Sequence, residues 1–468
     1  MHLHFLGICG TFMGSLAQLA KSIGHQVSGS DANVYPPMSN QLQQAGIELV
    51  EGFDPAQLNP TPDLIIVGNA LSRGNPCIEY ILDKKLAYTS GPQWLGGNVL
   101  KGKHVISVSG THGKTSTSSM LAKILDSASY HPGYLIGGVP KDFGVSARMG
   151  GAAPDGKNYF VIEADEYDTA FFDKRSKFVH YHSNSLIINN LEYDHADIFD
   201  DLAAIQRQFH HCVRTLPSNG NVIYPAANSA VLEVLKQGCW SQQLSFGAID
   251  APWQYKLLTD DGSEFTVLDK HSNQQATVSW QQTGLHNVCN AMAAIVASSE
   301  IGISLQQACD GLSSFVGVKR RMEPIYSAQN IIVYDDFAHH PTAIKTTLEG
   351  LRAKVGNAQI MAVIEPRSAT MKLGVHQQAL SDVVSDSDQV FWYQNASIDW
   401  DLAYIAQNCS VPASVAKDID GLLSTVLAAI ESNHNSNKAT HLVIMSNGGF
   451  DGFHPLLVER LASLLTAE

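Results

Sequence analysis

The sequence lacks the features that define several classes of protein. Its seven cysteines are scattered and never form a Cys-x-x-Cys pair, which argues against a disulfide framework or a structural zinc site and favours a reducing compartment. It has no excess of basic residues, because 30 Lys and Arg stand against 44 Asp and Glu, for a formal net charge of -14. That balance excludes broad electrostatic binding to nucleic acid or anionic membranes.

Long apolar runs are also missing. No stretch reaches the roughly 20 apolar residues that a membrane-spanning helix needs, so no membrane insertion is expected. The N-terminal region has neither Lys nor Arg before Lys21 and no cleavage-site pattern, which predicts that it is not a signal peptide. Together these absences predict a cytoplasmic protein.

What the sequence does contain is a series of short apolar runs that alternate with amphipathic helical stretches. This alternation predicts an α/β protein with mainly parallel sheets. At 468 residues, three domains are expected, with boundaries in a turn-rich segment before Val105 and near Gly317: residues 1–100, 101–316 and 317–468. Residues 244–280 alternate in polarity and predict a small antiparallel appendage to the middle domain. The expected strands are residues 2–6, 64–67, 105–108, 160–162, 186–188, 331–334, 360–364 and 442–445.

The strongest motif is GTHGKT, which follows the apolar run at 105–108 and opens a helical stretch. Glycines in such a loop let backbone N–H groups surround a phosphate, a lysine neutralises it, and a hydroxyl can ligate magnesium. Strand, loop, Lys-Thr and helix occur together, which disfavours an ordinary glycine-rich turn. The predicted nucleotide contacts are Gly110, Thr111, His112, Gly113, Lys114 and Thr115.

Two further strand ends carry candidate metal ligands. FVIEADEYD places Glu163 first after a strand, where a magnesium-bound nucleotide needs a hard oxygen ligand; without the phosphate loop, a solvated acidic turn would be preferred. In LIINNLEYDHADIF, the apolar run is followed by Asn189, Asn190, Asp194 and His195. A lone histidine is usually structural, yet this context favours a second metal site or a phosphate contact at His195.

A glycine-rich turn also lies near the N-terminus. GICGTFMG departs from the GxGxxG spacing, so it indicates a dehydrogenase only weakly, but a diphosphate at this helix start is physically reasonable. The candidate residues for a UDP-sugar are Gly7, Gly10, Gly14 and Asp31.

These motifs, together with LHNVCNAMAA at 285–294, the KRRME segment and YDDFAHHPTA at 334–343, resemble the Mur ligase superfamily across essentially the whole chain. The resemblance implies a Rossmann-like N-terminal domain that binds a UDP-sugar, a central P-loop ATPase domain, and a Rossmann-like C-terminal domain that receives an amine. It also implies ATP as co-substrate and Mg²⁺ as cofactor.

The resemblance assigns roles to individual residues. Lys114 and Thr115 would serve the triphosphate and magnesium, Glu163 and His195 the metals, and Arg320 the phosphates. His339 and His340 would hold phosphate or guide the amine, with a helix N-cap contact as the alternative. The residues implied near the adenosine are His286, Asn287, Asn290 and Asp335.

Two loops are more specific, EPRSATMKLG at 365–374 and MSNGGFDGFH at 445–454. They resemble the branch that joins UDP-N-acetylmuramate to the murein tripeptide L-alanyl-γ-D-glutamyl-meso-diaminopimelate in peptidoglycan recycling; the alternative is the L-alanine-adding branch of peptidoglycan biosynthesis. Several carboxylates on a tripeptide need cationic and hydroxyl donors, although Arg367 or Lys372 alone could be a solvated surface charge. The candidate peptide contacts are Arg367, Ser368, Thr370, Lys372 and Asn447.

Some questions stay open. Several branches carry a metal-bridging carbamylated lysine about one helix beyond the Asp-His pair, whereas residues 203–213 contain no Lys, so the second metal shell is undetermined. The rival functions are an NAD-dependent oxidoreductase, which leaves the phosphate loop unexplained, and a nucleotide-dependent switch, which predicts binding without substrate-stimulated ADP formation. The sequence does not determine the oligomeric state.

Overall fold

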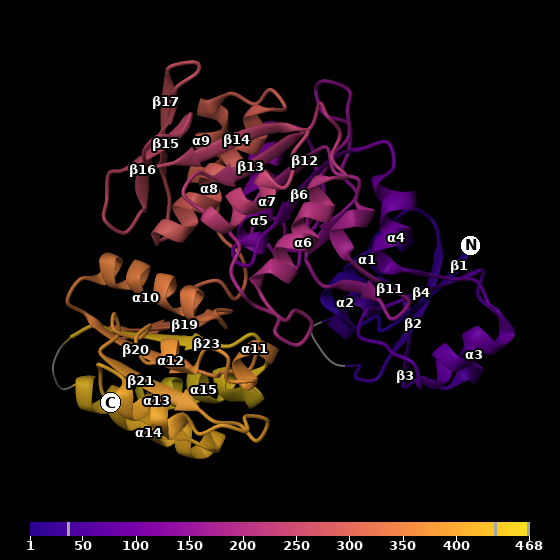
Figure 1. Ribbon diagram of the computed structural model, residues 1–468. Coiled ribbons are helices and arrows are strands. Elements are labelled where there is room, and N and C mark those ends of the chain that lie inside the picture. Colours follow the sequence, from indigo (N-terminus) through magenta and orange to yellow (C-terminus); the bar gives the residue numbers. More distant parts are fainter. Residues whose placement is uncertain (35–37, 435–437, 466–468) are drawn as a thin grey trace.

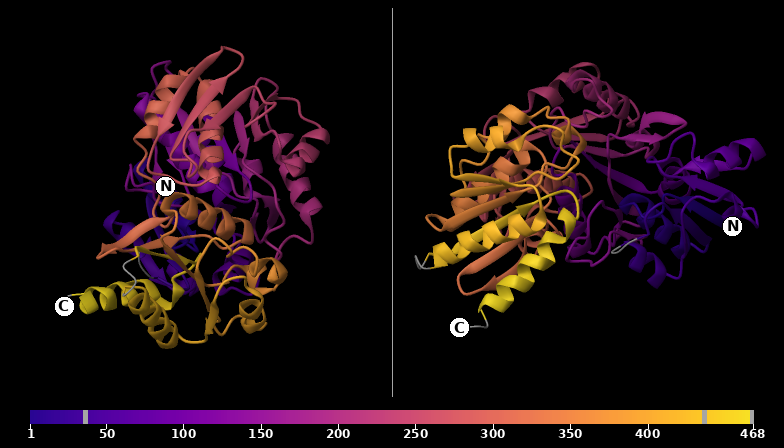
Figure 2. Two further views of the ribbon diagram at one scale, coloured as in Figure 1. Left: turned by 90° about the vertical axis from the view of Figure 1, so that its left-hand side faces the viewer. Right: turned by 90° about the horizontal axis from the view of Figure 1, so that it is seen from below.

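The computed structural model describes residues 1–34, 38–434 and 438–465, and its strands form three large sheets (Figure 1). The middle sheet lies between the other two along the chain, and the C-terminal sheet and its helices form a separate body beside it (Figure 2). The three-domain α/β architecture expected from the strand pattern is therefore present.

The N-terminal sheet has five parallel strands in the order β3-β2-β1-β4-β5. Its strands are β1 (His2–Leu6), β2 (Gln26–Asp31), β3 (Glu48–Glu51), β4 (Leu64–Val67) and β5 (Tyr88–Ser90). Its helices are α1 (Thr11–Ser22), α2 (Met38–Gln44), η1 (Pro55–Leu58), α3 (Pro76–Lys84), α4 (Gly91–Leu95) and η2 (Gly96–Leu100). The turn between β1 and α1 holds Gly7 and Gly10, whereas Gly14, also expected in the turn, lies within α1.

The central sheet has ten strands in the order β17-β16-β15-β14-β13-β12-β6-β9-β7-β8. Its strands are β6 (His104–Ser109), β7 (Gly133–Leu135), β8 (Ala147–Arg148), β9 (Tyr159–Glu163), β12 (Ser185–Ile188), β13 (Asn221–Pro225), β14 (Gln242–Gly247), β15 (Trp253–Leu257), β16 (Glu264–Asp269) and β17 (Gln274–Ser279). The expected appendage is antiparallel only at β15–β17, and it continues the main sheet, because β14 and β15 pair in parallel.

Helices cover both faces of the central sheet. One face packs on α5 (Lys114–Ser127), α8 (Leu285–Ser299) and α9 (Leu305–Ser313), and the other on α6 (Leu202–Val213) and α7 (Ser229–Lys236). The segment between β9 and β12 forms a hairpin of β10 (Asp168–Ala170) and β11 (Asp173–Ser176), followed by η3 (Lys177–His180). Since β6, β9 and β12 are parallel neighbours, their carboxyl ends bring the three predicted motifs to one edge.

The C-terminal sheet has the order β18-β19-β23-β20-β21-β22 and only β18 is antiparallel. Its strands are β18 (Glu323–Ala328), β19 (Ile331–Asp336), β20 (Gln359–Ile364), β21 (Gln389–Tyr393), β22 (Ala413–Ala416) and β23 (Thr440–Met445). Its helices are α10 (Pro341–Val355), α11 (Ala369–Lys372), α12 (Gln377–Leu380), α13 (Leu402–Asn408), α14 (Ile419–His434), η4 (Phe450–Gly452) and α15 (Phe453–Leu465).

The buried clusters show which domains share a core. One apolar cluster includes Leu16 and Leu19 of α1 together with Phe178 and Phe209 of the central domain, so the first two domains pack through a common interior. The two clusters of the C-terminal sheet contain no described residue before Met322. The C-terminal domain therefore has a core of its own.

Candidate active site

The phosphate loop connects the end of β6 to the start of α5. Gly110 and Gly113 both have positive φ, +126° and +80°, which favours glycine. A Cβ at Gly113 would collide with the side chain of Asn290, and one at Gly110 with the backbone of Asn190. The loop is held by hydrogen bonds from the N–H groups of Thr111 and His112 to the carbonyl and side-chain oxygens of Asn190, at 3.2 and 2.8 Å.

Lys114 begins α5 and its ammonium group lies inside the loop. It donates hydrogen bonds to the carbonyl of Gly110 at 2.8 Å and to Glu166 at 3.1 Å, and it lies 3.5 Å from Asp165. Burial alone would lower the pKa of Lys114, but the surrounding carboxylates, Glu166 first, raise it above its ordinary value. The lysine is therefore a fixed positive charge, suited to a phosphate oxygen.

Thr115 and Glu163 come together as the sequence predicts. The Thr115 hydroxyl lies 3.0 Å from both carboxylate oxygens of Glu163, and the Gly137 N–H donates to Oε2 at 2.7 Å. Burial raises the pKa of Glu163 although Lys114 acts in the opposite direction, so the carboxylate has less positive charge nearby than its ionised form requires. A hydroxyl beside a carboxylate is an oxygen donor set that fits Mg²⁺.

His195 lies on the other side of Lys114. Its Nε2 is 3.1 Å from Glu166 Oε1, and Asp165, Glu166 and His195 offer ligand atoms within 4.8 Å of one another. Burial would lower the pKa of His195, but the contact with Glu166 raises it overall. This group is the place where the residues present could form a second metal site.

The three residues expected near adenine lie at the start of α8. Burial, with the charges of Arg321 and His112, lowers the pKa of His286 to about 4. Asn290 is buried against the phosphate loop and accepts a 3.4 Å hydrogen bond from Asn189, whereas Asn287 donates to the Thr283 carbonyl at 2.8 Å. His286 and Asn290 thus border the loop, and Asn287 bonds to its own helix start.

The two arginines of the KRRME segment have different surroundings. Arg320 bonds within its own domain, to Asp335 at 3.2 Å and to the carbonyls of Ser446 and Gly448 at 2.8 and 2.7 Å. Asp335 also lies 3.2 Å from His454. In this arrangement Arg320 and Asp335 form an ion pair within the C-terminal domain, and neither side chain contacts the phosphate loop in these bonds.

Arg321 is the arginine whose charge reaches the central domain. Its positive charge contributes to lowering the pKa values of Glu163 and His286 in the central domain and of His339. Both guanidinium groups lie over the Phe337 ring, that of Arg321 at 4.8 Å and that of Arg320 at 5.2 Å from its centre. Arg321 was not among the residues expected at the site, although the adjacent arginines of the KRRME segment made both of them candidates. Both Arg320 and Met322 have positive φ, +59° and +45°. This irregular backbone gives the adjacent side chains of Arg320 and Arg321 different surroundings.

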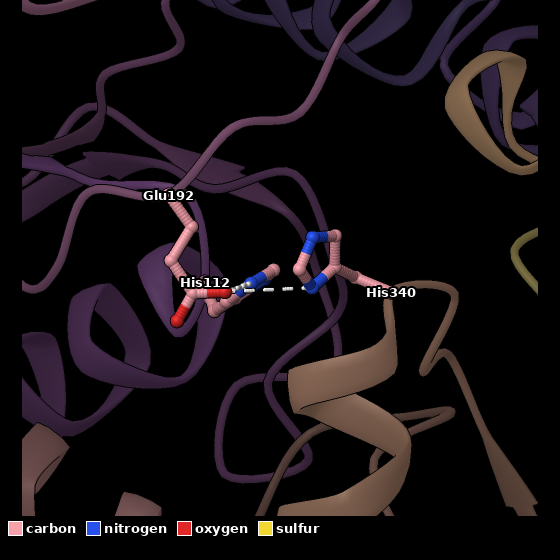
Figure 3. A group of neighbouring side chains, drawn as sticks. All are labelled: His112, Glu192 and His340. Atoms are coloured by element: carbon pink, nitrogen blue, oxygen red, sulfur yellow. Dashed lines mark hydrogen bonds and ion pairs between the residues drawn. The ribbon is translucent and has the colours of Figure 1, made fainter. Parts of the chain in front are cut away.

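A histidine–glutamate cluster, consisting of His112, Glu192 and His340, lies where the phosphate loop meets the C-terminal domain (Figure 3). His112 Nε2 is 3.4 Å and His340 Nδ1 is 3.5 Å from Glu192 Oε2, and the Thr342 hydroxyl donates to that oxygen at 2.6 Å. His340 Nδ1 also accepts from the Thr342 N–H at 3.3 Å as the N-cap of α10. The alternative helix-cap role is therefore present for His340.

The other histidine of the pair, His339, points differently. Its Nδ1 lies 2.9 Å from the Phe337 carbonyl, and its own carbonyl accepts from Ser368 at 3.3 Å. Burial lowers the pKa of His339 to about 4 and that of His340 to about 3, so both imidazoles are neutral near pH 7. Neutral imidazoles can accept a proton or bind a metal.

The N-terminal turn places its predicted residues together. Gly7 has a φ of +78°, and Gly14 faces Met38, whose sulfur leaves no room for a Cβ. The Asp31 carboxylate accepts from the Cys9 N–H at 2.8 Å and so holds the turn between β1 and α1. Gly10 is the N-cap of α1 and has no side chain to cap it, which leaves the first N–H groups of α1 available to an anion.

The two C-terminal loops place the predicted peptide contacts in unlike settings. Arg367 is 40% exposed, lies against Gly448 and is 3.9 Å from Glu365. Ser368 caps α11, whose half-buried Lys372 is the last residue. Asn447 has a buried Oδ1 without a hydrogen-bond partner.

Thr370 is fully buried and reaches across to the central domain. Its hydroxyl donates to Asp194 at 2.6 Å and accepts from the Ala196 N–H at 3.2 Å. Burial opposes ionisation of Asp194, but His195 and Thr370 hold the pKa of its carboxyl well below its usual range. In this structure Thr370 is a contact between domains.

Among the described residues, no helix has the length and apolar character needed to cross a bilayer. Three family models match the chain: "Mur ligase family, catalytic domain" at residues 2–101, "Mur ligase middle domain" at 108–298 and "Mur ligase, glutamate ligase domain" at 320–448.

The chain is similar over nearly its full length to characterised relatives. It is 50% identical to an Escherichia coli protein over 99% of this chain and 98% of the relative, and 49% identical to a Haemophilus influenzae protein over 98% and 99%. Both are named UDP-N-acetylmuramate–L-alanyl-gamma-D-glutamyl-meso-2,6-diaminoheptandioate ligase. The crystal structure of a murein peptide ligase from Psychrobacter arcticus is 48% identical, covers 98% of each chain and superposes with a TM-score of 0.76.

Proposed function

The chain belongs to the Mur ligase family, and from that premise we propose that it joins UDP-N-acetylmuramate to L-alanyl-γ-D-glutamyl-meso-diaminopimelate at the cost of ATP. Mur ligases are ATP-dependent, and both relatives at 49–50% identity are named as ligases. The observation that carries the proposal is that this identity extends over 98–99% of the chain. Such a ligation belongs to peptidoglycan recycling.

The proposed reaction has two steps. The lactyl carboxylate of the sugar attacks the γ-phosphorus of ATP, so that a C–O–P bond forms and ADP leaves. The alanyl amine of the peptide then attacks the acyl carbon through an anionic tetrahedral intermediate, the C–N bond forms, and phosphate leaves with the carboxylate oxygen. Activation is needed because a free carboxylate has no good leaving group, and catalysis is mainly positioning and charge neutralisation.

The phosphate loop supplies most of the proposed nucleotide contacts. Lys114 neutralises the transferred phosphate, the backbone N–H groups of Gly113, Lys114 and Thr115 at the start of α5 contact it, and His286 and Asn290 border the base. The N–H groups of Thr111 and His112 instead hold the loop on Asn190. Thr115 and Glu163 would hold Mg²⁺, which supplies positive charge on the phosphate oxygens. His195 would hold a second ion with Asp165 and Glu166.

For the arginine that crosses from the C-terminal domain we propose Arg321 rather than Arg320. The support is that Arg321 acts electrostatically on Glu163, whereas Arg320 is occupied by Asp335 and two carbonyls. Arg320 then positions the turn that presents Arg321. His339 is proposed to contact the acyl phosphate or the amine, because it is neutral and lies near Arg321.

The remaining assignments divide between the outer domains. Gly7 and Gly10 of the β1–α1 turn, with Gly14 of α1 and Asp31 at the end of β2, are proposed for the UDP diphosphate. Arg367, Ser368, Lys372 and Asn447 are proposed for the carboxylates of the peptide. We place the domain boundaries after residues 100 and 316. All seven cysteines are free, which supports a cytoplasmic, reducing location.

The decisive assay compares amine substrates. Purified protein with ATP, Mg²⁺ and UDP-N-acetylmuramate is given either free L-alanine or the tripeptide, and both phosphate and the ligated product are measured. We expect phosphate release with the tripeptide and little with L-alanine. More efficient use of L-alanine would support the alternative L-alanine ligase, and nucleotide binding without any product would support a switch.

A further inference from the structure

The histidine–glutamate cluster has donor atoms from three segments and two domains. His112 belongs to the phosphate loop, Glu192 follows β12, and His340 caps α10 of the C-terminal domain. Figure 3 shows the two rings converging on the carboxylate. The three ligand atoms all lie within 4.8 Å of one another.

The spacing of these atoms suits a metal better than direct hydrogen bonds. The imidazole nitrogens lie 3.4 and 3.5 Å from Glu192 Oε2, so the His112 contact is a long hydrogen bond and the His340 contact is longer still, whereas an N–H···O bond usually spans 2.7–3.2 Å. Ligands bound to Zn²⁺ at about 2.0–2.1 Å with tetrahedral angles lie about 3.3–3.4 Å apart. Glu192 Oε2 also accepts a hydrogen bond from the Thr342 hydroxyl at 2.6 Å. The carboxylate is therefore within close hydrogen-bonding distance of Thr342, and only its distances to the two histidines are long.

The hydrogen bonding around His340 is also incomplete. Its Nδ1 faces both the Thr342 N–H, at 3.3 Å, and the Glu192 carboxylate, at 3.5 Å, and it cannot be acceptor to one and donor to the other. Its Nε2 is buried without a hydrogen-bond partner. Within the described residues, the ion pairs of Glu192 go only to the two histidines and none to Lys or Arg. A bound cation would supply the missing charge.

We propose that this cluster binds a borderline divalent cation of the Zn²⁺ type through His112 Nε2, Glu192 Oε2 and His340 Nδ1, with the fourth position open. Ligation uses the Nδ1 lone pair that otherwise accepts from the Thr342 N–H, so the cation replaces this weak 3.3 Å cap of α10. Two imidazoles and one carboxylate select such a cation over Mg²⁺, which prefers oxygen ligands. Thr342 orients the carboxylate from outside the ligand shell. Because the ligands come from two domains, the ion fixes the C-terminal domain against the phosphate loop.

The site is separate from both metal positions proposed above, Thr115 with Glu163 and His195 with Asp165 and Glu166, and its test does not depend on ligation. Untagged full-length protein is titrated with Co²⁺ in excess Mg²⁺, and the visible absorption of tetrahedral Co²⁺ is recorded. We expect one tightly bound Co²⁺ per chain. Glu192→Gln keeps an acceptor for Thr342, and His340→Asn keeps an N-cap oxygen, and each is expected to weaken Co²⁺ binding at least tenfold.

A matched control uses a histidine outside the cluster. His211→Asn, on the exposed side of α6, is expected to leave the Co²⁺ absorption unchanged. Zn²⁺ should also raise the thermal midpoint of the unmodified protein more than that of Glu192→Gln. The site would be rejected by weak octahedral absorption alone, by retention of the signal in Glu192→Gln, or by its loss in His211→Asn. If His340→Asn does not fold, Glu192→Gln decides.

Discussion

The two junctions between domains are built from different chemistry. The N-terminal and central domains share one buried apolar cluster, and Ser15 of α1 bonds to Ser146 at 2.7 Å within it. The contacts described between the central and C-terminal domains are largely polar: Thr370 with Asp194, Thr342 with Glu192, and the histidines around that carboxylate.

This difference indicates which junction can open. Separating the first two domains would expose their shared core to water, at a free-energy cost of about 25 cal/mol per Å² of apolar surface. At the second junction, water can replace the polar contacts. Domains with such polar interfaces commonly move relative to one another. Most residues proposed for the nucleotide and those proposed for the peptide lie on opposite sides of this second junction, so we expect its closure to bring them together.

The largest expected effect lies on the central side of that junction, at Lys114. Lys114→Ala is expected to reduce product formation on the order of a hundredfold or more, because the loop amides cannot replace a full charge beside the triphosphate. Phosphate release measures the loss, and an unchanged thermal midpoint shows that the fold is retained. Near-normal turnover by a folded variant would remove Lys114 from the site.

The second effect tests the contribution that crosses the junction. Arg321→Ala is expected to lower kcat roughly thirtyfold, from about 2 kcal/mol of lost charge-assisted bonding, while nucleotide affinity changes little. Arg320→Ala is the matched comparison and is expected to lower the thermal midpoint more than Arg321→Ala does. If Arg320→Ala loses more turnover at equal stability, the assignment of the two arginines is reversed.

A smaller effect is expected at the amine side, where Arg367 is partly exposed. Arg367→Ala is expected to raise the apparent KM for the tripeptide about tenfold, because one charge-assisted contact to a carboxylate is worth roughly 1.4 kcal/mol. Arg367→Lys retains the charge but not the planar guanidinium group, so its KM for the tripeptide should lie between those of the unmodified protein and Arg367→Ala. An unchanged KM in Arg367→Ala would make this arginine a solvated surface charge.

The smallest effect concerns the junction itself. Thr370→Val removes a buried bond to Asp194 and is expected to cost about 1.5 kcal/mol of stability at pH 7, with little change in kcat. The folded-state pKa of Asp194 lies below its usual range, so its stabilisation is present above about pH 3.9 and is lost as the pH falls further. The thermal midpoints of variant and parent should therefore converge below pH 4. A raised tripeptide KM in Thr370→Val would instead support a peptide contact.

Much of the nucleotide site could be predicted because it needs only local rules. Thr115 meets Glu163 since each follows one of two neighbouring parallel strands, β6 and β9. The different surroundings of Arg320 and Arg321, on which our proposal for Arg321 depends, could not be predicted, because they depend on backbone angles set by contacts with the rest of the protein. The burial of Thr370 likewise depends on how two domains dock, which hydrophobic patterning within either domain does not encode.

The turn that carries the two arginines has a consequence for domain exchange. Gly317, Arg320 and Met322 all have positive φ. Two backbone hydrogen bonds join this turn to the central domain: the Lys319 N–H donates to the Val139 carbonyl, and the Lys141 N–H donates to the Gly317 carbonyl. A chimera that joins this C-terminal domain to another ligase should therefore include residues 317–323 unchanged, together with the C-terminal domain. Inserting a single residue before Arg320 is expected to change which arginine takes the position proposed to reach the phosphates, while the other motifs keep their sequence.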